Sequence, residues 1–536
     1  MAGTVSGSLP HGMFRAVGSA PSLPSRLNDT KGAASMSIRS NTFNALAAAM
    51  ALALCAAGSA SAAGRVDLSS LHADGSQSFG RLLVTYKPGT APRRDAVSFN
   101  KAIGAAASAA SNRLGGGDNT VQLKRLRRTA GGTDVVLSNR ALSRDEAITV
   151  MKEIAADENV LAVSNDIRMV PYLTPNDPKF KDQFGFGTGA GGIRATQAWD
   201  VTQGAGAVVA VIDTGITNHS DLNANVIGGY DMISGDDPAD ALPHPYYVAN
   251  DGNGRDANPA DPGDGISFSE YFSNATLQKY CRYGSSTWHG THVSGTVAAV
   301  TNNAKGVAGT APAAKVVPVR VLGKCGGYGS DIADAIIWAS GGSVPGIPAN
   351  PNPADVINMS LGGSQPAACP QIYKDALSAA AARGSIVVVA AGNSDQDTLT
   401  ATDTSGAAVG YTMTNCGTVI SVASTTSSGA RSSFSNYGAG IDIAAPGSSI
   451  VSTHNSGSQG PSTESYKSNS GTSMASPHVA GVAALVQSVA PTPLTQEQMR
   501  SLLKRTARAF PVAIDKPIGP GIVDAAAAVN AARNGQ

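Results

Sequence analysis

The sequence lacks the features that mark several common protein classes. Its net charge is only +1, from 39 Lys and Arg against 38 Asp and Glu, so neither nucleic acid nor an acidic substrate is favoured as a partner. Its 5 cysteines include no Cys-x-x-Cys pair, and no His-Glu-x-x-His motif occurs, which argues against common zinc sites. Its apolar runs are too short to span a bilayer comfortably, so we expect no stable membrane anchor.

An apolar run near the N-terminus, at residues 45–57, is typical of an export signal. Arg39 supplies positive charge before it, and the small residues 60–62 follow it as a cleavage site. Residues 1–35 are polar and irregular, so we expect them to lie upstream of the true start or to be disordered. We predict a signal peptide at 36–62 and secretion, with an uncleaved anchor as the alternative.

Charge is divided unevenly along the chain. Residues 1–173 carry 19 Lys and Arg against 12 Asp and Glu, whereas residues 174–536 carry 20 against 26. Without the signal, residues 63–173 still carry 15 against 11. A basic front and an acidic back indicate two parts that can dock onto each other.

The front part alternates strand and helix signals in the order of a ferredoxin-like α+β unit, at about 81–170. A capping box of Ser143 and Glu146 opens its second helix. Residues 173–178 then read as an exposed linker. We expect strands at 81–87, 121–127, 133–137 and 160–170, and helices at 91–112 and 143–159.

The back part, residues 174–536, has the pattern of an α/β fold. Continuous apolar runs alternate with Ala-rich helical patterns, and strands that are apolar on every residue are buried on both faces. This predicts a parallel sheet covered by helices, with binding sites at the carboxyl ends of its strands. The runs lie at 207–212, 315–321, 355–359, 385–390 and 418–423.

Four polar residues stand where such a sheet would form a site. Asp213 and Asn393 follow two of the apolar runs, His289 opens a Gly-containing segment, and Ser473 precedes an Ala/Val-rich helix. An Asp in this position could also cap a helix or bind a metal. His289 and His292 could likewise be metal ligands.

The segments around these residues resemble the subtilase family. Gly-Thr-Ser-Met-Ala-Ser-Pro-His-Val-Ala-Gly at 471–481 matches the family pattern residue for residue, and Asp-Thr-Gly, His-Gly-Thr-His-Val-Ser-Gly-Thr, Asn-Met-Ser-Leu-Gly-Gly and Ala-Ala-Gly-Asn occur in the family's order. The resemblance covers roughly 174–530. It implies a subtilisin-like fold and a secreted serine endopeptidase, with residues 63–173 similar to the pro-segment that assists folding and then inhibits.

The resemblance assigns a role to each residue. Asp213, His289 and Ser473 would form the catalytic triad, in the chain order of subtilisin. His289 would take the serine proton and Asp213 would orient the imidazole. The side chain of Asn393 and the backbone N–H of Ser473 would stabilise the oxyanion. His292, His478 and His219 are expected to be structural.

Two Gly-containing segments resemble the edges that bind an extended peptide in subtilases. Such edges accept substrate as an added strand, and recognition through the backbone gives broad specificity. Proteins and peptides are therefore the expected substrates. The residues are Ser360, Leu361, Gly362 and Gly363 on one side, and Gly326 and Gly327 on the other.

The four cysteines of the exported part favour disulfides, with three possible pairings. Cys281 precedes the His289 segment and Cys325 lies on one substrate edge, whereas Cys369 and Cys416 follow the two sides of the pocket. We pair 281 with 325 and 369 with 416, because each pair would tie loops on one rim. The other pairings remain open.

The interval between Asp213 and His289 is longer than the family minimum and contains an acidic loop. Its carboxylates, Asp251, Asp256, Asp261 and Asp264, suit a structural Ca²⁺ ion, although the spacing is not that of an EF-hand. A solvated acidic loop is the alternative. Asp221, with Asn302 or Asn303, resembles another calcium position of the family.

Two other functions compete with the protease. A catalytically weak, peptide-binding subtilase would have lost a triad residue, and none is lost. A serine esterase of the α/β-hydrolase type needs Gly-x-Ser-x-Gly, with acid and base after the serine. Here Thr472 precedes Ser473, and Asp213 and His289 come first. We expect a monomer that acts on proteins.

Overall fold

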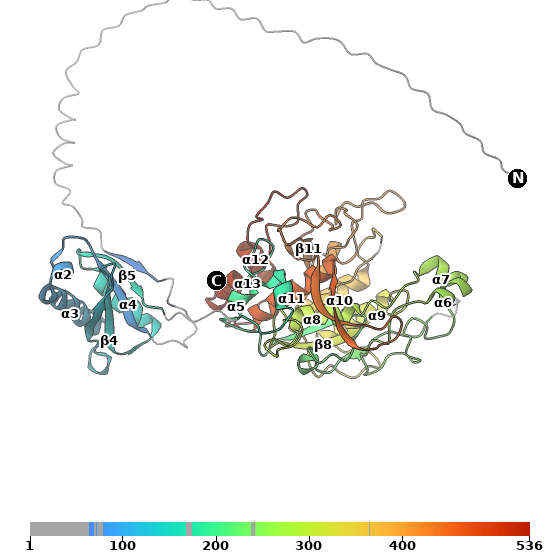
Figure 1. Ribbon diagram of the computed structural model, residues 1–536, viewed down its shortest axis with the longest axis horizontal. Coiled ribbons are helices and arrows are strands. Elements are labelled where there is room, and N and C mark those ends of the chain that lie inside the picture. Colours follow the sequence, from blue (N-terminus) through green and yellow to red (C-terminus); the bar gives the residue numbers. More distant parts are fainter. Residues whose placement is uncertain (1–63, 69–70, 72–78, 168–173, 237–241, 364) are drawn as a thin grey trace, which may run out of the picture. The chain divides into compact units, whose positions relative to one another are not determined.

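The computed structural model describes residues 64–68, 71, 79–167, 174–236, 242–363 and 365–536 (Figure 1). The predicted signal peptide at 36–62 lies outside the described residues, as do residues 1–35. We describe the front part, 64–167, and the back part, 174–536, separately. Within the described residues, no helix has the length and apolarity needed to cross a membrane.

The front part forms a five-stranded sheet in the order β1-β5-β2-β4-β3. The predicted strand–helix–strand–strand–helix–strand order is present, and β1 extends the sheet by pairing parallel to β5. The strands are β1 (Arg65–Asp67), β2 (Phe79–Tyr86), β3 (Leu123–Arg128), β4 (Asp134–Leu142) and β5 (Val160–Asn165), and the helices are α2 (Ala91–Arg94), α3 (Ala96–Arg113) and α4 (Arg144–Ala155).

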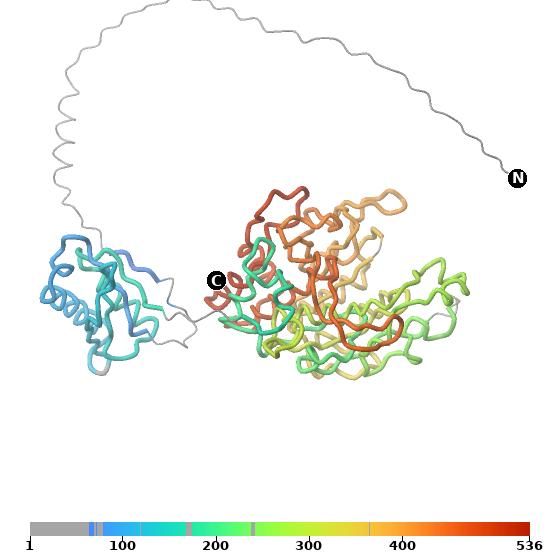
Figure 2. Tube along the Cα trace, in the orientation of Figure 1, coloured from blue at the N-terminus to red at the C-terminus, as the bar shows by residue number. Residues whose placement is uncertain are grey.

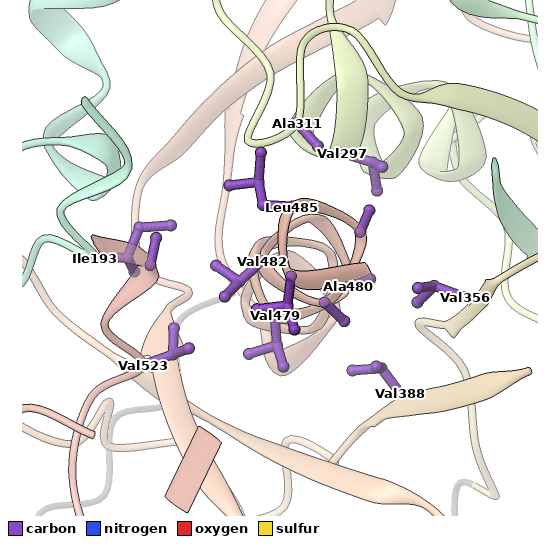
Figure 3. Packing of buried hydrophobic residues seen from close by; sticks show 14 of the residues in the cluster. Ile193, Val297, Ala311, Val356, Val388, Val479, Ala480, Val482, Leu485 and Val523 are labelled. Carbon is purple, nitrogen blue, oxygen red and sulfur yellow. The ribbon is translucent and has the colours of Figure 1, made fainter. Parts of the chain in front are cut away.

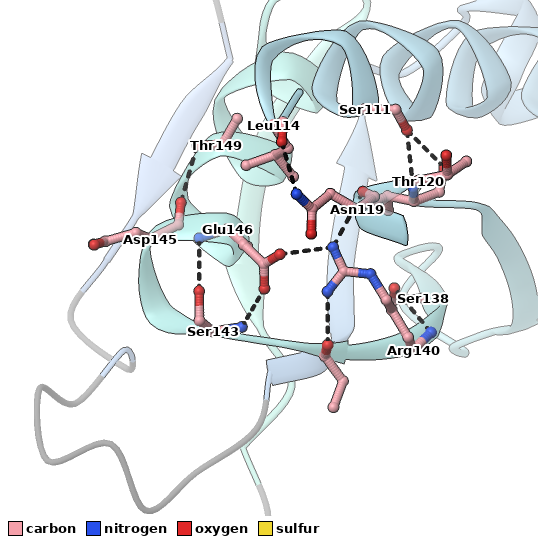
Figure 4. Close-up of polar contacts among 12 residues, drawn as sticks. Ser111, Leu114, Asn119, Thr120, Ser138, Arg140, Ser143, Asp145, Glu146 and Thr149 are labelled. Atoms are coloured by element: carbon pink, nitrogen blue, oxygen red, sulfur yellow. Dashed lines mark hydrogen bonds and ion pairs between the residues drawn. The ribbon is translucent and has the colours of Figure 1, made fainter. Parts of the chain in front are cut away.

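Local capping defines the helices of the front part. The predicted helix at 91–112 is divided at Asp95, which has an extended backbone and accepts a hydrogen bond from Ser98 N at 2.7 Å, so that α3 starts afresh. The capping box of Ser143 and Glu146 is present (Figure 4). Glu146 also binds Arg140 at 2.6 Å, and this bond together with that from Ser143 N lowers the pKa of Glu146 to about 2.

The back part contains a seven-stranded parallel sheet in the order β12-β11-β10-β9-β6-β8-β7. All five predicted strands belong to it. The two edge strands, β7 and β12, were not predicted, and β7 is only 2 residues long. The strands are β6 (Val208–Asp213), β7 (Tyr230–Asp231), β8 (Lys315–Arg320), β9 (Val356–Met359), β10 (Ile386–Ala390), β11 (Ile420–Thr425) and β12 (Ile443–Pro446), followed by an antiparallel hairpin of β13 (Ile450–Asn455) and β14 (Glu464–Asn469).

Helices cover both faces of this sheet, as the continuous apolar runs predict. Along β6, Val209 and Val211 face one core cluster while Ala210 and Ile212 face the other. The first face is covered by α5 (Ala195–Ala198), α8 (His289–Ala298), α11 (Thr472–Gln487), α12 (Gln496–Thr506) and α13 (Ala525–Arg533), and the second by α9 (Gly329–Ala339) and α10 (Gln371–Ala382).

Helix α11 lies at the centre of the first core. Val479, Ala480, Val482 and Leu485 project from it in different directions toward neighbours from α8, the sheet and the C-terminal segment (Figure 3). A helix that is apolar all round is a buried helix. Ser473 lies in its first turn, so the candidate nucleophile is held by a buried helix.

A long insert separates β6 from α8. It carries β7 and two short helices, α6 (Phe268–Ser273) and α7 (Ala275–Tyr280), which lie at one end of the back part (Figure 2). Cys281 at the end of α7 is bonded to Cys325, and Cys369 is bonded to Cys416, which confirms the predicted pairing. The first bond fastens the insert to the segment that follows β8.

Candidate active site

The candidate catalytic residues meet at the carboxyl edge of the sheet. Asp213 ends β6, while Ser360 and Asn393 follow β9 and β10. His289, Asn393 and Ser473 line one cleft of about 1120 Å³. The sheet topology therefore brings together residues that are far apart in sequence, as the strand-end rule predicts.

Asp213 and His289 form a close pair. Asp213 is fully buried, and its Oδ1 and Oδ2 lie 2.8 and 3.0 Å from His289 Nδ1. A carboxylate can only accept, so Nδ1 carries the proton and Nε2 is left as the basic nitrogen. Burial opposes protonation of His289, but the charge and hydrogen bond of Asp213 outweigh it and raise the pKa of His289 above its usual value.

The backbone on both sides of His289 is tightly constrained. Trp288 adopts the left-handed conformation with φ of 50°, is fully buried, and donates from Nε1 to Gly457 O at 2.8 Å. A β-carbon on Gly290 would overlap the carbonyl oxygen of Gly215, next to the Asp213 segment. Glycine at 290 is therefore what lets the segments that carry Asp213 and His289 touch.

Ser473 and Ser360 exchange two hydrogen bonds. Pro477 has no N–H, so the carbonyl oxygen of Ser473, four residues earlier, has no partner within the helix. Ser360 Oγ donates to that oxygen at 2.8 Å, and Ser473 Oγ donates to Ser360 O at 3.1 Å. This proline, which falls inside α11, thus frees a carbonyl through which the Ser473 segment is bonded to Ser360.

Asn393 is oriented by the segment that carries Ser473. Its Oδ1 accepts from Thr472 N at 2.8 Å and from Thr472 Oγ1 at 3.0 Å. Because the backbone N–H can only donate, the amide must present its oxygen there and its NH₂ elsewhere. A β-carbon on Gly471 would lie 3.6 Å from Asn393 Nδ2 and 3.7 Å from Ser473 N, so the two expected oxyanion donors flank one small space.

The other predicted structural histidines are buried and held by backbone groups. Burial lowers the pKa of His292 to about 3 and that of His478 to about 4, so both are neutral. His292 Nε2 contacts two carbonyl oxygens and His478 Nδ1 donates to Met474 O. His219 Nε2 similarly donates to Ser465 O at 3.0 Å.

The predicted substrate edges lie on the cleft with one exception. Ser360, Leu361, Gly362, Gly363 and Gly326 line it. Gly327 does not, because it lies against the residue that follows β8, where a β-carbon would overlap Val321 O. Its glycine serves the turn.

The structure does not gather the predicted calcium ligands. Asp251 binds Arg320 at 3.1 Å, Asp256 accepts from Asn253, and Asp261 accepts from Thr214. In the described part of the chain, no three His, Cys, Asp or Glu side chains form a group that could hold a metal ion. In this structure the carboxylates of the acidic loop accept hydrogen bonds from donors within the protein, and loop composition alone could not reveal those donors.

Sequence reasoning missed several supporting residues. Thr472 orients Asn393, and Thr214 Oγ1 accepts from Gly290 N at 3.0 Å. The fully buried Asn436 donates to Ala391 O and accepts from two backbone N–H groups of the loop that follows β10. The motifs contain Thr214 and Thr472, but their partners are distant in sequence, so no local signal identified the contacts.

Comparison with known proteins identifies the family of this chain. Residues 204–527 match the model of the subtilase family. The chain belongs to the subtilase family. It is a serine endopeptidase of the subtilisin type, with the α/β fold that its sequence predicts.

Several relatives are secreted proteases by name. An extracellular protease of Xanthomonas campestris pv. campestris is 52% identical over 459 residues, which are 86% of this chain and 74% of that protein. An extracellular basic protease of Dichelobacter nodosus is 44% identical over 410 residues, 76% of this chain and 64% of that protein. A solved protease structure from Pseudoalteromonas arctica is 51% identical, with a TM-score of 0.60, and covers 67% of this chain and 100% of that one.

Proposed function

We propose that this subtilase hydrolyses peptide bonds through Asp213, His289 and Ser473. The observation that carries the proposal is the 2.8 Å bond from His289 Nδ1 to buried Asp213, in a cleft that Ser473 also lines. The Ser473 hydroxyl would turn from Ser360 O to Nε2 of His289, which takes the proton as Oγ attacks the substrate carbonyl. His289 then protonates the leaving amine, and water repeats the sequence on the acyl-enzyme.

Asn393 Nδ2 and Ser473 N would donate to the oxyanion. Their positions on either side of the space beside Gly471 support this role. The amide needs no rearrangement during the reaction, since Thr472 already fixes its orientation. Donors held in place before charge develops are the effective ones.

An extended substrate would lie between two segments of the cleft. Ser360–Gly363 and Gly326 are the edges that it would join as an added strand. The glycines leave room for the substrate backbone and provide no side-chain pocket of their own. This supports broad specificity for unfolded protein segments.

We also propose secretion with self-maturation. A signal peptide at 36–62 and a ferredoxin-like pro-segment within 63–173 would precede the peptidase domain, residues 174–536, and the maturation cut would fall near the linker at 173–178. Extracellular relatives and the basic charge of the front part support this organisation. The pro-segment would be an intramolecular chaperone and inhibitor.

Mass spectrometry of the protein secreted by a protease-deficient host tests the proposal. Wild type should begin near the linker, and Ser473→Ala should begin near residue 63, because the variant lacks only the attacking hydroxyl. His289→Ala should give the same precursor. Normal processing of Ser473→Ala would show that another enzyme makes the cut.

A structural calcium ion is proposed at Asp221 instead of the acidic loop. Asp221 is fully buried, burial raises its pKa, and its carboxylate oxygens accept from three neutral donors, Asn303 Nδ2, Val307 N and Tyr466 OH. A buried carboxylate gains from a cation, and the amide oxygen of Asn303 could supply a second ligand after a flip. A chelator should lower the Tm of wild type but not that of Asp221→Asn. Equal Tm values for wild type with and without chelator would refute the ion.

A further inference from the structure

Two aspartates of the insert, Asp261 and Asp264, bind the residues on either side of His289. Asp264 Oδ1 accepts from Thr287 N at 2.6 Å and its Oδ2 accepts from Thr287 Oγ1 at 2.7 Å. Asp261 Oδ2 accepts from Thr214 Oγ1 at 2.8 Å, and that oxygen accepts in turn from Gly290 N. One aspartate therefore holds the residue two before His289, and the other reaches the residue just after it.

The segment that carries these aspartates is closely packed against neighbouring backbone. Asp261 is 3% exposed, and its N–H donates to Ile216 O at 2.9 Å. Gly263 has φ of 105°, and a β-carbon there would overlap Gln459 O in the β13–β14 hairpin. A β-carbon on Gly265 would lie 2.6 Å from Ser286 N. A loosely held acidic loop would not make such contacts, so this segment can act as a rigid support.

We propose that Asp261 and Asp264 are positioning residues for catalysis, which hold the His289 segment from both sides so that its imidazole faces Ser473. The proposal rests on the proposed triad and adds to it. Neither aspartate needs to touch the substrate. A displacement of about 1 Å in a catalytic base can cost a hundredfold in rate, so such a support has measurable value.

Asp264 also affects His289 through its charge. Besides Asp213, the charges of Asp264 and Asp261 raise the pKa of His289. Burial and then the charge of Asp264 raise the pKa of Asp261 to about 7, so Asp261 is fully ionised only in alkaline solution. Among the described residues, other charged or titratable groups near this cluster or along the cleft wall include His292, Arg320, His454, Lys279, Arg282, Tyr280, Tyr283 and Tyr411.

The first experiment separates the hydrogen-bonded support from charge. Thr214→Val removes the hydroxyl that links Asp261 to Gly290, whereas Thr214→Ser keeps it. We expect kcat for a chromogenic peptide to fall about tenfold in Thr214→Val and Asp261→Ala with KM within about twofold, and to stay near wild type in Thr214→Ser. Wild-type kcat in Thr214→Val and in Asp261→Ala would overturn the role of Asp261.

The second experiment measures the pH profile of Asp264→Asn. An asparagine can keep both bonds to Thr287 but loses the charge that stabilises the imidazolium. The acidic limb of kcat/KM, and of the rate of Ser473 modification by a sulfonyl fluoride, should therefore move to lower pH by about half a unit. An unmoved limb would overturn the electrostatic role of Asp264.

The chain offers a matched control. Asp403 Oδ1 accepts from Ser405 N at 2.8 Å and from Ser405 Oγ at 2.6 Å, the same pair of donors, in a loop outside the cleft lining. Asp403→Asn should leave kcat and the pH profile unchanged, and an equal shift there would show a non-specific effect. An inactive wild type would instead refute the proposed function, so the two failures are distinguishable.

Discussion

Two regions of this subtilase place carboxylates near His289, and they do so differently. At the carboxyl edge of the sheet, Asp213 is fixed by β6 and touches the imidazole directly. In the insert, Asp261 and Asp264 bind Thr214 and Thr287 and affect the histidine through those neighbours. One carboxylate is thus positioned by a buried strand, and the other two are positioned by loop contacts. The following variants test that difference, from the largest expected effect to the smallest.

His289→Ala at the sheet edge should cause the largest loss. Without the base, the serine is a weak nucleophile, and kcat for peptide hydrolysis should fall by about 10⁶. The same assay on Asp264→Asn should show a change smaller than about tenfold. A similar decrease in kcat in both variants would contradict the proposed difference between the sheet edge and the insert.

Asn393→Ala should come next. It removes one oxyanion donor, so kcat should fall by about 10² to 10³ while KM stays nearly constant. Gly471→Ala should change kcat in the same direction but less, because its methyl would enter the space between the two donors. A loss confined to KM would show that Asn393 binds substrate instead of the transition state.

Opening the disulfide bond of the insert should mainly affect stability. Replacing both Cys281 and Cys325 by serine opens the tether between the insert and the segment after β8. The free energy of unfolding should decrease by about 3–4 kcal/mol, with kcat within about twofold, because the other contacts of the segment at 261–265 remain. Chemical denaturation and peptide kinetics on the same sample measure both. A large loss of kcat in the folded protein would show that the tether itself shapes the site.

Ser360→Ala should have the smallest effect of the set. It leaves the carbonyl oxygen of Ser473 without its donor, which should decrease the free energy of unfolding by about 1–3 kcal/mol. Ser360→Thr is the matched control, because it keeps a hydroxyl and should recover part of the loss. Thermal denaturation of the three proteins measures the difference. Equal Tm values for wild type and Ser360→Ala would show that water replaces the bond.

The sequence predicted the structure best where the fold's geometry requires a particular pattern of residues. The apolar runs predicted both covered faces of the sheet, and Asp213 and Asn393 were located because strand ends meet at one edge. The resemblance of the motifs to the subtilase family then gave each of these residues an expected role in catalysis. Even the division at Asp95 has a local signal, since Asp is a preferred helix cap, although the Ala-rich run concealed it.

The insert was less predictable because its contacts depend on partners far along the chain. Asp261 and Thr214 are 47 residues apart, and Gln459, which lies close to Gly263, belongs to the β13–β14 hairpin. Composition showed carboxylates suited to calcium but not the hydroxyl and backbone donors that bind them. Edge strands as short as β7 likewise have too few residues for a periodic pattern.

Covalent labelling tests the central claim most directly. A sulfonyl fluoride should attach to the mature protein in a ratio of about one to one, as expected for one activated serine. Peptide mass spectrometry should locate the label on Ser473, and His289→Ala should lose the rapid reaction. Labelling at another serine, or undiminished labelling of Ser473 in His289→Ala, would contradict the triad.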